Sequence, residues 1–242
     1  MLEFVLATII CLGAGVITGA TGFGFGLVAV PLLGVLIDPR AAVVISLVAG
    51  LPSAAWVMLR STAPIAGRPS LVMSATAAIG MPAGLWAAWQ LSTDALAVTI
   101  GILVIASTIA LAFGLRFAPR DRSYITAGLL SGFLAPGTGM GGPPIVIAIQ
   151  GSGIGATSSR RTSAAVLSIQ SVLAFAVIAA AGGVELPDLV FASGALPATF
   201  VGTLIGSLVF AKMTESRARA VVLLVLLASG LGAIAHGLGL YG

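Results

Sequence analysis

The sequence predicts an all-α integral membrane protein made of two inverted repeats, and three observations indicate it. The 242 residues are 59% hydrophobic and only 7% charged, which is too apolar for the surface of a soluble domain. Uncharged runs recur along the chain. Several of them are close in length to the roughly 20 residues that one membrane-crossing helix needs. Small and polar residues also recur in the same order in both halves, which indicates an internal duplication.

The first uncharged run, residues 4–37, is too long for one crossing and is broken by glycines at its centre. At about 1.5 Å per residue, 4–19 reaches the middle of a bilayer without crossing it comfortably. The glycines then interrupt the helix, and 27–37 forms a second short one. We therefore expect a re-entrant helical hairpin over 4–37, with its tip at Gly19-Ala20-Thr21-Gly22-Phe23-Gly24-Phe25-Gly26.

Three membrane-crossing helices complete the first repeat, which spans 1–116, and we expect them at 41–59, 69–91 and 95–115. They are predicted as helices because lipid requires each segment to satisfy its own backbone, and a barrel would show short alternating strands instead. Gly80 and Gly84 have the spacing of small residues at close helix contacts. A basic segment, 117–122, links the two repeats and is expected in the cytoplasm.

The second repeat, 123–242, follows the same plan. Its expected elements are a hairpin and three helices: 123–157, 162–184, 189–211 and 217–240. The motif Gly15-x-x-Thr18-Gly19 matches Gly128-x-x-Ser131-Gly132. Further along, Gly80 and Gly84 match Gly202 and Gly206 at a constant offset of 122 residues.

The distribution of basic residues predicts the orientation of the chain. If each hairpin returns to its starting face, ten of the eleven Lys and Arg residues lie on one face and only Arg40 lies opposite. If both hairpins crossed instead, the eleven would divide five to six. The positive-inside rule favours the first arrangement and makes that face cytoplasmic, in a multi-pass protein of the cell inner membrane. The acidic residues expected outside are Asp38, Asp94, Glu185 and Asp188.

The uncharged runs contain no group suited to catalysis. The chain has one histidine and one cysteine, so it offers no metal-binding cluster and no carboxylate pair for acid-base chemistry within the membrane. We expect no catalytic residue, no metal and no cofactor. Transport or passive permeation therefore remains, and a membrane-embedded enzyme or assembly factor is the least favoured class.

Main-chain N–H groups at the hairpin tips can bind an anion without a fixed charge. The second helix of each hairpin begins at the tip, so its free N–H groups and positive dipole end point toward the membrane centre. The alternative is that the glycines serve only close packing and that each hydroxyl bonds to its own helix. The expected substrate-binding residues are Thr21, Gly22, Phe23, Gly24, Phe25, Gly26, Ser46, Thr138, Gly139, Met140, Gly141, Gly142, Ser168 and Gln170.

A family resemblance rests on these glycine motifs. The pattern Gly15-x-x-Thr18-Gly19-x-x-Gly22-Phe23-Gly24-Phe25-Gly26, with Gly-Met-Gly-Gly-Pro-Pro at 139–144, resembles the TauE/SafE sulfite exporter family. The similarity spans nearly the whole chain, including the duplication and the basic linker, and it implies secondary transport of sulfite, organosulfonates or related anions. Phe25 stands where many relatives carry glycine, and Ala135-Pro136-Gly137 extends the second tip, which leaves the particular anion open.

The function expected from the sequence is secondary transport of a small sulfur-containing anion, sulfite or a short organosulfonate. Export is favoured, because an inside-negative potential of about 100 mV gives an outgoing anion roughly 2.3 kcal/mol per charge. The alternatives are an anion channel or facilitator, and an importer of a related organic or sulfur oxyanion. The expected partners are the anion and the lipid bilayer. Nucleic acid is not expected, because the basic residues stand at helix ends, and a homodimer is left open.

Overall fold

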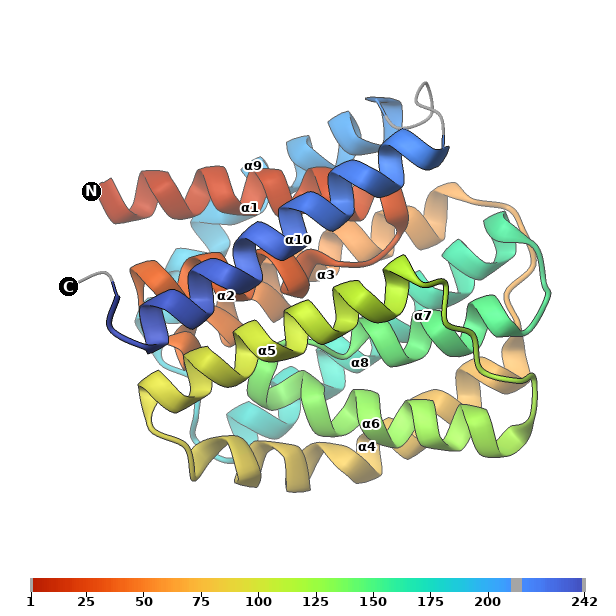
Figure 1. The fold of residues 1–242 in the computed structure, drawn as a ribbon, viewed down its shortest axis with the longest axis horizontal. Helices are drawn as coiled ribbons and strands as arrows, with labels where there is room; N and C mark the ends of the chain where they lie inside the picture. The colour runs from red at the N-terminus through yellow and green to blue at the C-terminus, as the bar shows by residue number, and fades with distance from the viewer. Residues whose placement is uncertain (1, 210–214, 241–242) are drawn as a thin grey trace.

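The computed structural model describes residues 2–209 and 215–240, with side chains omitted for 215–219, and these residues form ten helices and no strand (Figure 1). The all-helical class predicted from the sequence is therefore confirmed. In chain order the helices are α1 (Leu2–Thr21), α2 (Phe25–Leu36), α3 (Pro39–Arg60), α4 (Gly67–Trp89), α5 (Thr93–Ala112), α6 (Asp121–Thr138), α7 (Gly142–Gly151), α8 (Ala156–Ala180), α9 (Leu186–Val209) and α10 (Glu215–Gly237).

Seven helices of the described residues are long and apolar enough to cross a membrane: α1, α3, α4, α5, α8, α9 and the 220–237 part of α10. The chain is thus a multi-pass membrane protein, as its composition predicts. α2 and α7 are shorter, at 12 and 10 residues. α1 has 20 residues, about 30 Å at the α-helical rise, so it is longer than the half-crossing expected from the sequence.

The helix breaks fall at the two glycine segments. Gly22 and Gly24, between α1 and α2, have φ angles of 85° and 99°, and Gly139, between α6 and α7, has a φ of 68°. Only glycine adopts these left-handed conformations without steric cost. The chain can therefore stop one helix and begin the next within a few residues at each segment.

The helices pair between the two halves of the chain. α1 packs along α9 and α4 packs along α6, while α3 lies against α8 and α5 against α10 (Figure 1). Matched glycines form the closest of these contacts. A Cβ on Gly84 would overlap the carbonyl oxygen of Phe133 in α6, and a Cβ on Gly206 would overlap that of Val16 in α1. The helices therefore approach backbone to backbone, as small residues allow in membranes.

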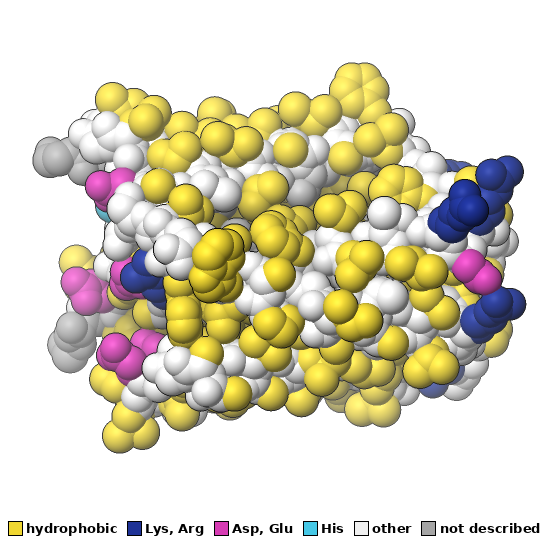
Figure 2. All heavy atoms as spheres, turned by 90° about the horizontal axis from the view of Figure 1, so that it is seen from below, with side chains coloured by type: hydrophobic (Ala, Val, Ile, Leu, Met, Phe, Trp, Pro, Cys, Tyr) yellow, Lys and Arg dark blue, Asp and Glu magenta, His cyan; other side chains and the backbone are white. Residues whose placement is uncertain are grey.

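Charged side chains gather at the two ends of the molecule. On the face shown in Figure 2, a hydrophobic band lies between an end with most of the Lys and Arg residues and an end with most of the Asp and Glu residues. The α3–α4 loop and the α5–α6 linker share the basic end (Figure 1), where Arg68 and Asp121 form an ion pair of 2.6 Å. Lys212 and the side chains of Arg217 and Arg219 lie outside the described part.

Candidate functional site

A small cavity of about 70 Å³ lies where the two glycine segments meet. The segments touch directly, because a Cβ on Gly26 would overlap the carbonyl oxygen of Gly139 and a Cβ on Gly142 would lie 3.7 Å from the Phe23 ring. A cavity of this size holds several waters or one small oxyanion. Ten of the expected site residues line it: Gly22, Phe23, Gly24, Phe25, Gly26, Ser46, Gly139, Gly141, Gly142 and Gln170.

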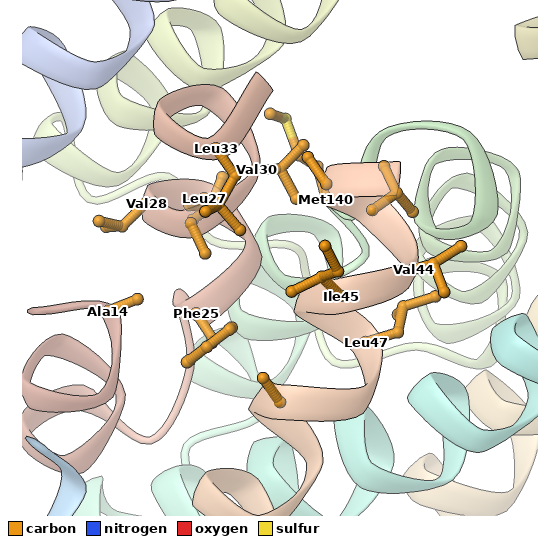
Figure 3. Packing of buried hydrophobic residues seen from close by; sticks show 14 of the residues in the cluster. Ala14, Phe25, Leu27, Val28, Val30, Leu33, Val44, Ile45, Leu47 and Met140 are labelled. Atoms are coloured by element: carbon orange, nitrogen blue, oxygen red, sulfur yellow. The ribbon is translucent and has the colours of Figure 1, made fainter. Parts of the chain in front are cut away.

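The start of α2 presents main-chain donors to this cavity. Its N-cap is Gly24, which has no side chain that could accept a hydrogen bond from the helix. The first N–H groups of a helix have no acceptor within it. The Phe25 ring packs on Gly50 of α3, where an added Cβ would come within 2.8 Å of the ring. Figure 3 shows Phe25 and Leu27 within the apolar cluster that joins α2 to α3. The helix start is therefore held firmly in place.

The start of α7 differs from that of α2. Its first residue is Gly142, and Pro143 and Pro144 follow directly. Proline carries no N–H, so these two residues suit the first turn of a helix but donate nothing. The two glycine segments are therefore unequal, and the first turn of α2 has more free N–H groups than that of α7.

Two buried polar side chains in the cavity each have an atom that lacks a hydrogen-bond partner among the described residues. Gln170 is 2% exposed and Ser46 is 5% exposed, and within the described part of the chain neither Gln170 Nε2 nor Ser46 Oγ has a hydrogen-bond partner. A buried donor left unpaired costs about 1–3 kcal/mol, so such groups in a native structure call for an explanation. A polar ligand in the cavity would supply the missing partner.

Ser131 contacts the amide oxygen of Gln170. The Ser131 Oγ lies 2.5 Å from Gln170 Oε1 and 2.6 Å from the Gly141 carbonyl oxygen. Its single proton can serve only one of these acceptors at a time. Ser131 is the residue that corresponds to Thr18 in the repeat motif, and neither was expected to bind the substrate. Thr18 lines the cavity too, although its hydroxyl donates to the Ala14 carbonyl at 2.9 Å.

Four of the expected site residues lie away from the lining. The hydroxyl of Thr21 bonds to carbonyl oxygens of Ile17 and Phe23, at 2.9 and 2.6 Å. Those of Thr138 and Ser168 each donate to the carbonyl four residues earlier, at 2.7 and 2.8 Å. Met140, 1% exposed, packs in the hydrophobic core beside α2 and α3 (Figure 3). These hydroxyls follow the usual habit of Ser and Thr in helices.

A larger hollow of about 580 Å³, here called the vestibule, opens at the acidic end. The charged residues that line it are Asp38, Arg40, Glu185 and Asp188. The last turn of α6 lies between vestibule and cavity, since Pro136 and Gly137 line the vestibule while Ala135 and Gly139 line the cavity. Among the described residues, no three His, Cys, Asp or Glu side chains are grouped to hold a metal ion.

Comparison with known proteins identifies the family. The family model described as sulfite exporter TauE/SafE matches residues 7–233. A search of curated proteins and a search of solved structures each found no match. Membership of this family implies membrane transport of sulfite or related anions rather than enzymatic activity. Because the match covers nearly all of the 242 residues, the chain belongs to the TauE/SafE sulfite exporter family.

Proposed function

We propose that the chain is a secondary transporter that exports sulfite or a short organosulfonate across the cytoplasmic membrane. Family membership supports this class of substrate. The observation that carries the proposal is the cavity between the glycine segments. All of the described residues that line this cavity are neutral. Its donors are the free N–H groups at the start of α2, the amide of Gln170 and the hydroxyl of Ser46.

An oxyanion suits these donors better than a cation or an apolar ligand does. The positive end of the α2 dipole favours negative charge, and none of the described carboxylates lines the cavity to oppose it. Hydrogen bonds to a charged group contribute about 1.5–3 kcal/mol each. Several such bonds offset the loss of hydration when a small anion leaves water, and the several oxygens of sulfite or a sulfonate can accept them together.

Pairing of the helices supports the proposed division of the chain into two equivalent repeats. If α1 is equivalent to α6, and α4 to α9, exchanging the repeats converts the α1–α9 contact into the α6–α4 contact. The remaining large interfaces, α3–α8 and α5–α10, each join equivalent helices. In this proposal the repeats, 1–116 and 123–242, move against each other around the cavity and expose it to one side at a time.

The basic end is proposed to face the cytoplasm, and cysteine labelling tests this. In a Cys11→Ala background, Thr93→Cys and Ala118→Cys each place one exposed thiol, at the acidic and basic ends respectively. A membrane-impermeant maleimide should label position 93 in intact cells, and position 118 only after the cells are permeabilised. Labelling of both positions in intact cells would contradict this orientation and the hairpins inferred from it.

Export is proposed because the membrane potential favours outward movement of an anion, and the charge at the acidic end slows binding from outside. An inside-negative potential of about 100 mV contributes roughly 2.3 kcal/mol per charge. In addition, three carboxylates and one arginine line the vestibule at the acidic end. Their net negative charge lowers the local concentration of anions at the outer face and so slows binding from outside.

Flux through proteoliposomes tests the proposed function. Purified protein should release preloaded sulfite or isethionate, and a potassium diffusion potential, negative inside, should accelerate the release. Empty liposomes supply the control. No flux of either anion would contradict the substrate class, and flux indifferent to the potential would contradict electrogenic export. Counterflow should also appear, because a carrier shows it and an open channel does not.

A further inference from the structure

Arg160 reaches the first glycine segment from the basic side of the cavity. Its guanidinium donates a hydrogen bond to the Gly19 carbonyl in the last turn of α1. Its Cγ lies 2.5 Å from where a Cβ on Gly22 would stand, and Gly22 lines the cavity. On α8, Arg160 precedes the cavity residues Leu167 and Gln170, which places it about 10–15 Å nearer the basic end.

The neighbouring arginine uses its donors differently. Arg161 Nε donates to the Met58 carbonyl at 3.0 Å, and its Nη1 donates to the Ala63 carbonyl. Arg161 therefore ties α8 to the end of α3. Arg160 is also half-buried, but its Nε has no partner among the described residues. A cation with an unused donor thus stands beside a cavity that is otherwise neutral.

The geometry points to Arg160 as the cytoplasmic gate of the anion site. With the gate closed, Arg160 bridges α8 and α1 through the Gly19 carbonyl. When an anion arrives from the cytoplasm, the guanidinium leaves this neutral carbonyl and bonds to the anion, because a hydrogen bond between opposite charges gains Coulomb attraction that a bond to a neutral acceptor lacks. This role rests on the proposed function and adds a cationic contact that the neutral cavity lacks.

A gate at the cytoplasmic face predicts that loss of Arg160 changes anion binding from that face alone. A carrier exposes its site to the cytoplasm and to the outside in turn, and Arg160 meets the anion only in the cytoplasmic state. Its loss should weaken binding from the cytoplasm and leave binding from outside almost unchanged. A purely structural arginine that caps the last carbonyls of α1 would alter both sides equally.

Transport in oriented membrane vesicles tests the gate. Arg160→Gln should raise the apparent KM for sulfite at the cytoplasmic face by about 10- to 100-fold, measured in inside-out vesicles. In right-side-out vesicles the KM should stay within about two-fold, and Arg160→Lys, which keeps the charge, should show a smaller increase. Arg120→Gln is the matched control, because it removes an exposed basic residue from the linker and should change neither KM.

Several results would overturn the gate. Equal changes at both faces would make Arg160 structural, and an unchanged cytoplasmic KM would remove it from the path of the anion. If Arg160→Gln fails to fold, the wild type can be tested instead by modifying its arginines with phenylglyoxal. Sulfite should protect Arg160 from modification but not Arg120. Lack of protection at Arg160 would refute the gate. Absence of sulfite flux through the wild type would contradict the proposed function and the gate together.

Discussion

Gly84→Ala is expected to lower the unfolding temperature of the purified protein by about 6–12 °C, which corresponds to about 3 kcal/mol. The added Cβ would overlap the Phe133 carbonyl oxygen. The overlapping atom belongs to the backbone, so no side-chain rotation can relieve the clash. α4 and α6 must separate and lose contacts along their shared length. Thermal unfolding in detergent, followed by tryptophan fluorescence, measures the change.

Two further glycines supply the controls for this prediction. Gly13→Ala in α1 should leave stability unchanged or raise it by about 0.5–1 kcal/mol, because a Cβ there meets no atom within 4 Å and alanine is the better helix former. Gly206→Ala, against Val16 in the α1–α9 interface, should match the loss seen for Gly84→Ala. A Gly84→Ala protein as stable as Gly13→Ala would show that this close contact does not hold the helices together.

Gln170→Leu is expected to weaken sulfite binding by about 10- to 100-fold, because it removes one donor to a charged ligand. Leucine nearly preserves the volume of the side chain, and the substitution eliminates an amide nitrogen that is buried without a partner among the described residues. Ser131 keeps the Gly141 carbonyl as an acceptor. Stability should therefore be retained while affinity falls. Equilibrium binding of radiolabelled sulfite to the purified protein measures the affinity, and thermal unfolding measures the stability.

Ser168→Ala is the matched control for Gln170→Leu. Ser168 lies on the same helix and is also buried, but its hydroxyl bonds to the Ala164 carbonyl. Its loss should leave sulfite affinity within about two-fold. Gln170→Glu places a carboxylate at the site and should abolish binding, because like charges in a poorly hydrated cavity repel strongly. Unchanged affinity in Gln170→Leu would remove this side chain from the site.

The sequence by itself determined the membrane class, the all-helical fold, the family and the positions of the helix breaks. These properties depend on local chemistry. Long uncharged runs must form helices in lipid, and the glycine clusters at 22–26 and 139–142 interrupt those helices because glycine adopts backbone conformations that other residues avoid. The matched glycines also marked the close helix contacts, since the spacing of small residues is visible along the chain.

Only the tertiary structure decided which polar groups reach the cavity. Ser168 and Gln170 are both site candidates in the sequence, yet Gln170 lines the cavity and Ser168 bonds to its own helix. The sequence likewise gives no sign that Arg160 contacts the first glycine segment while Arg161 ties down α3. The physical reason is that the packing of a helix against its neighbours sets which of its faces meets a cavity, and that rotation is settled by residues far away in the chain.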